Sequence, residues 1–123
     1  MKNDLTDRLM NFAVAIIKMS RKLDNSIENR IIKNQLIKAA TSAGANYEES
    51  QGASSTPDFI NKVKISLKEM RESNYWLNIL GQTVNPSDRP SDLDDLIGES
   101  EQLKKILGAI CRKKTGKINN NTL

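Results

Sequence analysis

The chain has 123 residues, the size of one ordinary domain, and a formal net charge of +4. Hydrophobic residues make up 37% of it and aromatic residues 4%, which suits apolar groups buried in narrow stripes better than a thick mixed core. Six glycines and three prolines are too few turn residues for an eight-stranded sandwich or barrel. The composition therefore favours a few long helices.

The residue types also exclude several kinds of chemistry. The chain has no histidine, which is the commonest metal ligand and the usual general base near neutral pH. Its single cysteine, Cys111, can form neither an intrachain disulfide nor a cysteine zinc site. No stretch approaches the roughly 20 apolar residues that a bilayer-spanning helix requires. We therefore expect a cytoplasmic protein that is not an enzyme, has no cofactor and has no membrane partner.

Hydrophobic spacing predicts the first two helices. The first helix carries an unbroken heptad seam, formed by Leu5, Leu9, Phe12, Ile16, Met19 and Leu23. The second helix is expected to begin near Ser26 or Ile27 and to run to about Ser50. Its apolar stripe is weaker because small residues occupy its second half. Residues 51–55 break the pattern and predict a loop.

The third helix is predicted from its start and stop signals as well as its seam. Thr56 is the expected N-cap, and Pro57 suits the first helical position. The helix should end before the Asn85-Pro86 pair, because proline restricts the residue that precedes it.

The fourth helix is expected to begin after an N-cap at Ser91, with Asp94 three residues further on in a relation like a capping box. Short connections between four long helices predict an all-α, antiparallel up-down-up-down four-helix bundle. The bundle domain should span residues 1–117, and residues 118–123 should form a flexible C-terminal tail.

Charge is distributed unevenly along the chain. Residues 85–101 hold one basic and six acidic residues, whereas residues 102–123 hold six basic and no acidic residues. Basic patches bind phosphate backbones by neutralising charge and releasing counterions, although a solvated basic face is the ordinary alternative. No base-reading motif is present, so binding of RNA or DNA would depend on charge or shape. The predicted nucleic-acid-binding residues are Lys18, Arg21, Lys22, Lys104, Lys105, Arg112, Lys113 and Lys114.

Small residues and two aromatic residues mark a candidate interface. Glycine in a helix interior costs ~1 kcal/mol relative to alanine, so another backbone is expected to approach Gly44 closely. That backbone belongs to the third helix, to a second subunit, or to both. The adjacent rings of Tyr75 and Trp76 point about 100° apart on a helix, so at least one lies off the core stripe and favours oligomerisation over base stacking. The predicted oligomer or partner interface consists of Gly44, Asn46, Tyr75 and Trp76.

Weaker candidates for chemistry are four carboxylates and the cysteine. The carboxylates, on the second and third helices, are Glu48, Glu49, Glu69 and Glu72. A cluster for Mg²⁺ or Mn²⁺ is conceivable, but surface ion pairs with nearby lysines and arginines are the favoured interpretation. Cys111 precedes three cations that would lower the pKa of an exposed thiol, whereas packing at a helix end is favoured. We therefore expect no catalytic residue and no metal site.

The middle of the chain carries a rather specific series of motifs. It begins with Ala40-Thr41-Ser42-Ala43-Gly44-Ala45-Asn46-Tyr47-Glu48-Glu49 and continues through Asp58-Phe59 and Ser66-Leu67-Lys68-Glu69. Over about residues 4–114 the chain resembles the 23S rRNA intervening-sequence protein family, small bacterial four-helix-bundle proteins. The positions that match the family pattern are Ser42, Asn46, Glu49, Phe59, Leu67, Glu69 and Glu72. Tyr47 and Ser66 depart from the isoleucine and alanine that are common there.

The resemblance implies an assembly more than an activity. Members of the family are similar to homopentameric bundles, and no enzymatic activity comes with the resemblance. Relatives include the accessory protein of diversity-generating retroelements, a basic pentameric barrel that binds a reverse transcriptase and nucleic acid. Two hypotheses follow: a non-enzymatic homo-oligomer that binds RNA or DNA, and a structural adaptor for a protein partner such as a reverse transcriptase or other nucleic-acid enzyme.

Overall fold

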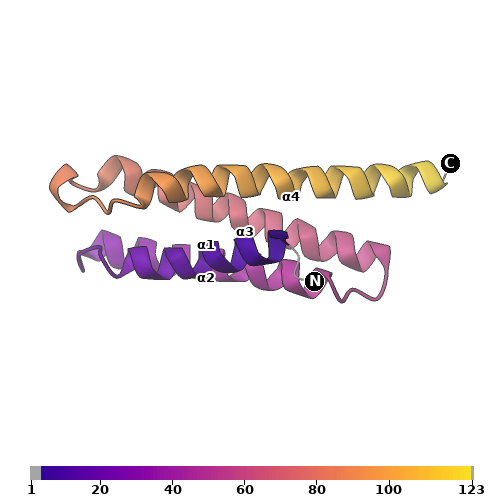
Figure 1. The fold of residues 1–123 in the computed structure, drawn as a ribbon, viewed down its shortest axis with the longest axis horizontal. Coiled ribbons are helices and arrows are strands. Elements are labelled where there is room, and N and C mark those ends of the chain that lie inside the picture. The colour runs from indigo at the N-terminus through magenta and orange to yellow at the C-terminus, as the bar shows by residue number, and fades with distance from the viewer. Residues whose placement is uncertain (1–3, 123) are drawn as a thin grey trace.

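A computed structural model shows four long helices and one short 3-10 turn (Figure 1). In chain order these are α1 (Asp4–Ser20), α2 (Ile27–Ser50), α3 (Thr56–Thr83), η1 (Pro86–Asp88) and α4 (Leu93–Thr122). The structure describes residues 4–122, and its side chains from residue 4 to residue 116. Helices that follow one another in the chain pack antiparallel, and α1 closes the bundle against α4. The predicted all-α, antiparallel four-helix bundle is confirmed.

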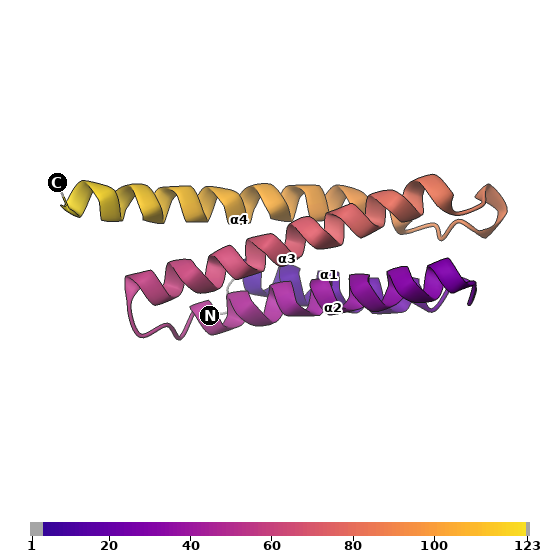
Figure 2. The same ribbon diagram turned by 180° about the vertical axis from the view of Figure 1, so that it is seen from behind.

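The order of packing places α3 between two neighbours. Seen from behind, α3 crosses diagonally from the level of α2 to the level of α4 (Figure 2). The packing of α1 on α2 and of α3 on α4 therefore gives two separate surfaces, each shared by one pair of helices.

Capping explains where α2 begins. The helix starts at Ile27, within the expected range; Ser26 is its N-cap, and the Ser26 hydroxyl accepts a hydrogen bond from the Asn29 backbone N–H at 3.2 Å. The Asp24 carboxylate supports this turn by accepting the Ser26 backbone N–H at 2.9 Å and the Asn29 side-chain amide at 3.0 Å. The hydrogen bond from the Ser26 backbone is the main cause of a lowered pKa at Asp24, because it stabilises the charged carboxylate.

The starts of α3 and α4 each differ from the sequence prediction by one position. The N-cap of α3 is Ser55 rather than Thr56, and its hydroxyl accepts the Asp58 backbone N–H at 3.2 Å. In α4 the first helical carbonyl is that of Asp92, which accepts the Leu96 backbone N–H at 3.0 Å. The expected cap at Ser91 is therefore wrong by one residue.

Asp94, the predicted capping partner at the start of α4, forms an ion pair instead. The Asp94 carboxylate pairs with the Arg89 guanidinium, which also donates to the Gly81 carbonyl at 2.9 Å. Arg89 thereby connects the end of α3 to the first turn of α4, where the helix dipole favours a carboxylate.

The core follows the predicted seams closely. Its largest side chains that are almost fully buried are Leu9, Ile16, Met19, Leu36, Val63, Met70, Leu77, Leu80, Leu93, Leu103 and Leu107. The heptad seam of α1 points inward as expected, with Leu5 partly buried at its start. In α4, Leu96 and Cys111 are buried, while Ile97 and Ile110 are only partly buried.

Polar side chains inside the bundle are paired. The Asn74 amide on α3 donates to the Ser100 hydroxyl on α4 at 2.8 Å, and both side chains are buried. The Ser66 hydroxyl donates to the Ala43 carbonyl on α2 at 2.6 Å. Among the described residues, no buried side-chain nitrogen or oxygen lacks a hydrogen-bond partner. This matches the usual rule for protein interiors.

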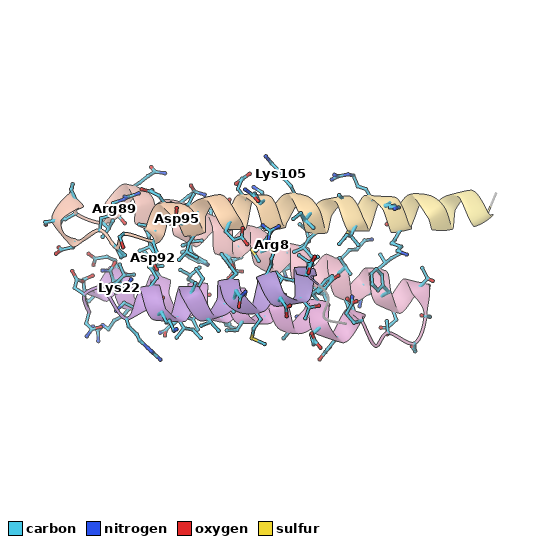
Figure 3. All side chains as sticks on the ribbon, in the orientation of Figure 1. Arg8, Lys22, Arg89, Asp92, Asp95 and Lys105 are labelled. Carbon is cyan, nitrogen blue, oxygen red and sulfur yellow. The ribbon has the colours of Figure 1, made fainter. Side chains whose placement is uncertain are left out.

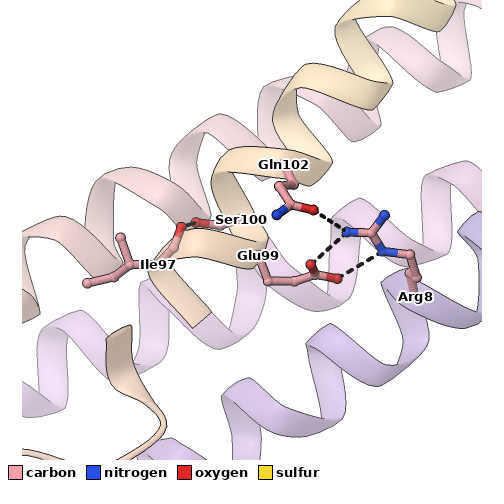
Figure 4. A network of polar contacts seen from close by, with 5 residues as sticks. All are labelled: Arg8, Ile97, Glu99, Ser100 and Gln102. Atoms are coloured by element: carbon pink, nitrogen blue, oxygen red, sulfur yellow. Dashed lines mark hydrogen bonds and ion pairs between the residues drawn. The ribbon is translucent and has the colours of Figure 1, made fainter. Parts of the chain in front are cut away.

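Polar contacts hold α1 against α4. Lys22, after the end of α1, lies 3.5 Å from the Asp92 carboxylate at the start of α4 (Figure 3). Further along, the Arg8 guanidinium donates to both carboxylate oxygens of Glu99, at 3.1 and 2.6 Å, and to the Gln102 side chain at 3.2 Å (Figure 4). The two parallel hydrogen bonds fix the orientation of the guanidinium relative to the carboxylate.

The backbone of α4 runs to Thr122, whereas the side chains from residue 117 onwards lie outside the described part of the structure. The domain boundary after residue 117 and the tail at residues 118–123 stay predictions.

Candidate nucleic-acid interface

Three basic side chains line one exposed face of α3. Lys64, Lys68 and Arg71 are spaced by four and then three residues, so they project from the same side of the helix. All three are exposed, and none of them pairs with a carboxylate in the described part of the chain. Unpaired cations on one helix face leave their charge available to a ligand.

Two basic residues of α4 extend this charge across the helix boundary. Burial is the main cause of a raised pKa at the Cys111 thiol, and the charges of Lys64, Arg112 and Arg71 partly oppose it. All three cations therefore lie near the same buried thiol, at the seam between α3 and α4. Lys104, two turns before Cys111, belongs to the same side of α4. The five residues Lys64, Lys68, Arg71, Lys104 and Arg112 are called the α3–α4 basic face.

The α4 side of this face is shaped by a glycine and one carboxylate. A Cβ on Gly108 would lie 3.3 Å from the Arg112 guanidinium, so the Arg112 side chain runs back along the bare backbone of α4. Lys104 lies 3.0 Å from the Glu101 carboxylate, and this hydrogen bond is the main cause of a lowered pKa at Glu101. Glu101 neutralises part of the charge at this edge, whereas the α3 stripe keeps all of its charge.

An exposed aromatic ring continues the α3 stripe. Tyr75 comes four residues after Arg71, and 59% of its surface is exposed. Its ring meets the Trp76 ring edge-on, with centroids 5.2 Å apart and planes at 75°. Trp76 is partly buried against the core, and its indole N–H donates to the Glu72 carboxylate at 3.3 Å. Tyr75 is thus the ring that leaves the core stripe.

The eight basic residues predicted from sequence do not form one patch. Lys18, Arg21 and Lys22 lie near the end of α1, where Lys22 pairs with Asp92. Asp92 precedes Lys104 by twelve residues, or about 18 Å along the axis of α4 at 1.5 Å per residue. The basic residues near the end of α1 are therefore far from those of α4.

The predicted α4 residues also diverge around their helix. Lys104 and Arg112 belong to the α3–α4 basic face; Lys105, seven residues before Arg112 and so on nearly the same side of α4, projects away from the bundle (Figure 3). Lys113 is exposed further along α4, and the Lys114 ammonium lies 5.6 Å from the centroid of the Phe59 ring, a cation–π contact.

The basic residues of α3 were missed by the sequence prediction. The sequence favours ion pairs of Lys68 and Arg71 with carboxylates of the second and third helices, and it does not single out Lys64. In the structure the only ion pair joining α2 to α3 runs, among the described residues, between Glu49 and Lys62 at 3.2 Å. The spacing of four and three residues was the available signal, because it places three cations on one face without an acidic residue between them on that face.

The predicted close approach at Gly44 is made within the chain, but by a different helix. A Cβ on Gly44 would lie 3.6 Å from the Leu9 carbonyl oxygen and 3.7 Å from the Leu9 Cβ. Gly44 therefore faces α1, and the expectation that it packs on the third helix is wrong. The helix α2 packs against both α1 and α3, and the backbone that approaches Gly44 is that of α1. Asn46 donates to the Ser42 carbonyl at 2.9 Å and the Ser42 hydroxyl at 3.1 Å, within α2.

A groove lies over this junction of α1 and α2. It has a volume of about 840 Å³ and is lined by Thr6, Asp7, Leu9, Met10, Ala13, Thr41, Gly44, Ala45, Glu48 and Gln51. Met10 on its rim is 64% exposed, and Val14 one turn further along α1 is 41% exposed. On α2, Ile31 is 56% exposed. Exposed large apolar side chains on neighbouring helices mark a surface suited to contact with another protein chain.

Other kinds of site find no support in the described residues. They contain no group of three or more cysteine, aspartate or glutamate side chains that could hold a metal ion. Nor do they include a helix that is both long and apolar enough to cross a membrane.

Comparisons with known proteins agree with this architecture. The family model of the 23S rRNA-intervening sequence protein matches residues 1–109. A solved structure from Bacteroides thetaiotaomicron, a protein of unknown function from the S23 ribosomal protein family, is 32% identical in sequence with a TM-score of 0.74. The match covers 87% of this chain and 97% of that one. No curated protein matches the chain. With most of its length matched by the family model, the chain belongs to the 23S rRNA-intervening sequence protein family.

Proposed function

We propose that this protein is a cytoplasmic, non-enzymatic nucleic-acid-binding protein whose contact surface is the α3–α4 basic face. The observation that supports this is the stripe of unpaired cations at Lys64, Lys68 and Arg71, with Arg112 beside it. Such a surface neutralises phosphates and releases their counterions, which requires no base-reading motif.

The proposal sets the expected dependence on salt. Five phosphate contacts give a slope of log K against log salt of about −4.5 for duplex DNA, since each contact contributes about −0.9. Affinity should therefore fall by about 500-fold between 50 and 200 mM salt. Measurable binding is expected at low salt, with weaker binding at physiological ionic strength.

Charge reversal on α3 tests the surface directly. A Lys64→Glu, Lys68→Glu, Arg71→Glu variant should lose most of its affinity for fluorescently labelled DNA or RNA in an anisotropy titration. The matched control reverses three basic residues on α1 and α2, Lys18, Arg21 and Lys38, and so changes the net charge by the same amount. The control should bind much more tightly than the α3 variant. Equal losses would show that only net charge matters, and a wild-type protein that binds nothing at 50 mM salt would refute the function.

We also propose that the chain self-associates through the groove between α1 and α2, in five copies as the family resemblance implies. The exposed side chains of Met10 on the groove rim and of Val14 one turn further along α1 support this, because a second copy would remove their apolar surface from water. Light scattering should give a mass well above 13.8 kDa for the wild-type chain. A Met10→Glu, Val14→Glu variant should shift towards the monomer, whereas Lys68→Glu should not. A wild-type mass of one chain would refute self-association.

A further inference from the structure

The α3 stripe combines three cations and an exposed aromatic ring on one helix face. Lys64, Lys68, Arg71 and Tyr75 are spaced by four, three and four residues, so one face of α3 presents three cations and then a ring. At 1.5 Å per residue the stripe is about 16 Å long, with successive members about 6, 4.5 and 6 Å apart along the helix axis.

Tyr75 is an exposed ring that contacts a partly buried neighbour. Its ring rests edge-on against Trp76, whose own position is fixed by partial burial and by the hydrogen bond to Glu72. More than half of the Tyr75 surface remains exposed beside Arg71. Because the contact with Trp76 limits the rotation of the ring, stacking a base on it should cost less side-chain entropy than stacking on an isolated exposed tyrosine.

The two halves of the stripe suit different parts of a single strand. Cations hold a sugar-phosphate backbone, and an exposed aromatic ring stacks on an unpaired base. A duplex offers the same phosphates, but its bases are already stacked and paired, so the ring gains nothing there. We infer that this stripe binds single-stranded nucleic acid, with Lys64, Lys68 and Arg71 on the backbone and Tyr75 stacked on a base. This inference rests on the nucleic-acid-binding function proposed above.

The test compares two probes and two substitutions at one position. Labelled oligothymidine of twelve nucleotides and a duplex of twelve base pairs are titrated by anisotropy at 50 mM salt. Tyr75→Ala should weaken binding of oligothymidine by about 5- to 160-fold, the usual contribution of one stacked base. It should leave duplex binding unchanged. Tyr75→Phe retains a ring and should bind oligothymidine within about twofold of wild type.

The outcomes separate this inference from the function on which it rests. Failure of the wild-type protein to bind either probe would refute nucleic-acid binding and the inference with it. Binding of both probes with no effect of Tyr75→Ala would refute the inference alone. Equal weakening of both probes would also refute it, because stacking on a free base acts on the single strand only. Circular dichroism of Tyr75→Ala should match that of the wild type, since the lost ring is exposed.

Discussion

Replacing Gly44 by alanine should stabilise the protein, although Gly44 lies at the contact between α1 and α2. The new Cβ would meet Leu9 at 3.6 to 3.8 Å, which is ordinary van der Waals contact, so nothing has to move. Alanine is favoured over glycine in a helix interior by about 1 kcal/mol. The free energy of unfolding should therefore rise by about 1 kcal/mol, and the melting temperature by about 4 °C in a chain of this size.

Alanine substitutions at two other helical glycines, Gly98 and Gly81, serve as controls for this prediction. A Cβ on Gly98 of α4 would have no neighbour within 4 Å, so Gly98→Ala reports helix propensity alone. A Cβ on Gly81 of α3 would lie only 3.1 Å from the Cδ1 of Ile97, so Gly81→Ala should gain less than the other two. Gly44→Leu should instead destabilise the protein, because the longer side chain has to displace α1 from its contact at Leu9.

The assay is urea unfolding followed by circular dichroism, at one fixed protein concentration because self-association would add concentration-dependent stability. The expected order of stability is Gly44→Ala at least equal to Gly98→Ala, with both above Gly81→Ala. The reasoning is refuted if Gly44→Ala is less stable than wild type while Gly98→Ala is more stable. That result would mean that the backbones of α1 and α2 approach more closely than the structure shows.

Three further predictions follow from single contacts. Ser100→Ala should lower the free energy of unfolding by about 1 to 3 kcal/mol in urea titrations, because it removes the buried partner of the Asn74 amide. Asp24 has a pKa below its unfolded value of about 3.9, so its stabilising effect is present above that pH and is lost as the pH falls through the folded value. The unfolding curves of wild type and Asp24→Ala should consequently differ at pH 7 and converge in acid. The buried Cys111 thiol has a raised pKa, so iodoacetamide should modify it slowly in the folded protein and rapidly in urea; equal rates would show that the thiol is exposed.

Helix positions and the core were predictable from the sequence because their signals are local. The seam of α1 repeats with the period of one helix, and the caps lie within a turn of the residues that they bind. The same local signals place helix starts only to within a residue. At α4 the sequence predicts a capping box between Ser91 and Asp94. In the structure the Asp94 carboxylate instead forms an ion pair with Arg89, the residue directly after η1. Such competition between partners is decided by the fold.

The candidate sites were less predictable because they depend on which helices become neighbours. Gly44 indicated a close approach, but the sequence does not say which helix makes it, and α1 rather than α3 does so. Lys68 and Arg71 had acidic residues nearby in the sequence and were therefore assigned to ion pairs. The structure leaves both unpaired among the described residues and sets Arg112 beside them. A face shared by two helices becomes visible only once their rotation is known.

The buried pair of Asn74 and Ser100 fixes the axial alignment of α3 and α4. Apolar seams repeat every three or four residues, so sliding one helix past the other by two turns brings leucine opposite leucine again. The same slide would leave the Asn74 amide facing hydrocarbon, at a cost of about 1 to 3 kcal/mol for an unpaired buried group. Single polar residues in helical cores set register in this way elsewhere. Because Lys64 and Arg71 lie on one helix and Arg112 on the other, the alignment that keeps this hydrogen bond also keeps the cations of the basic face side by side.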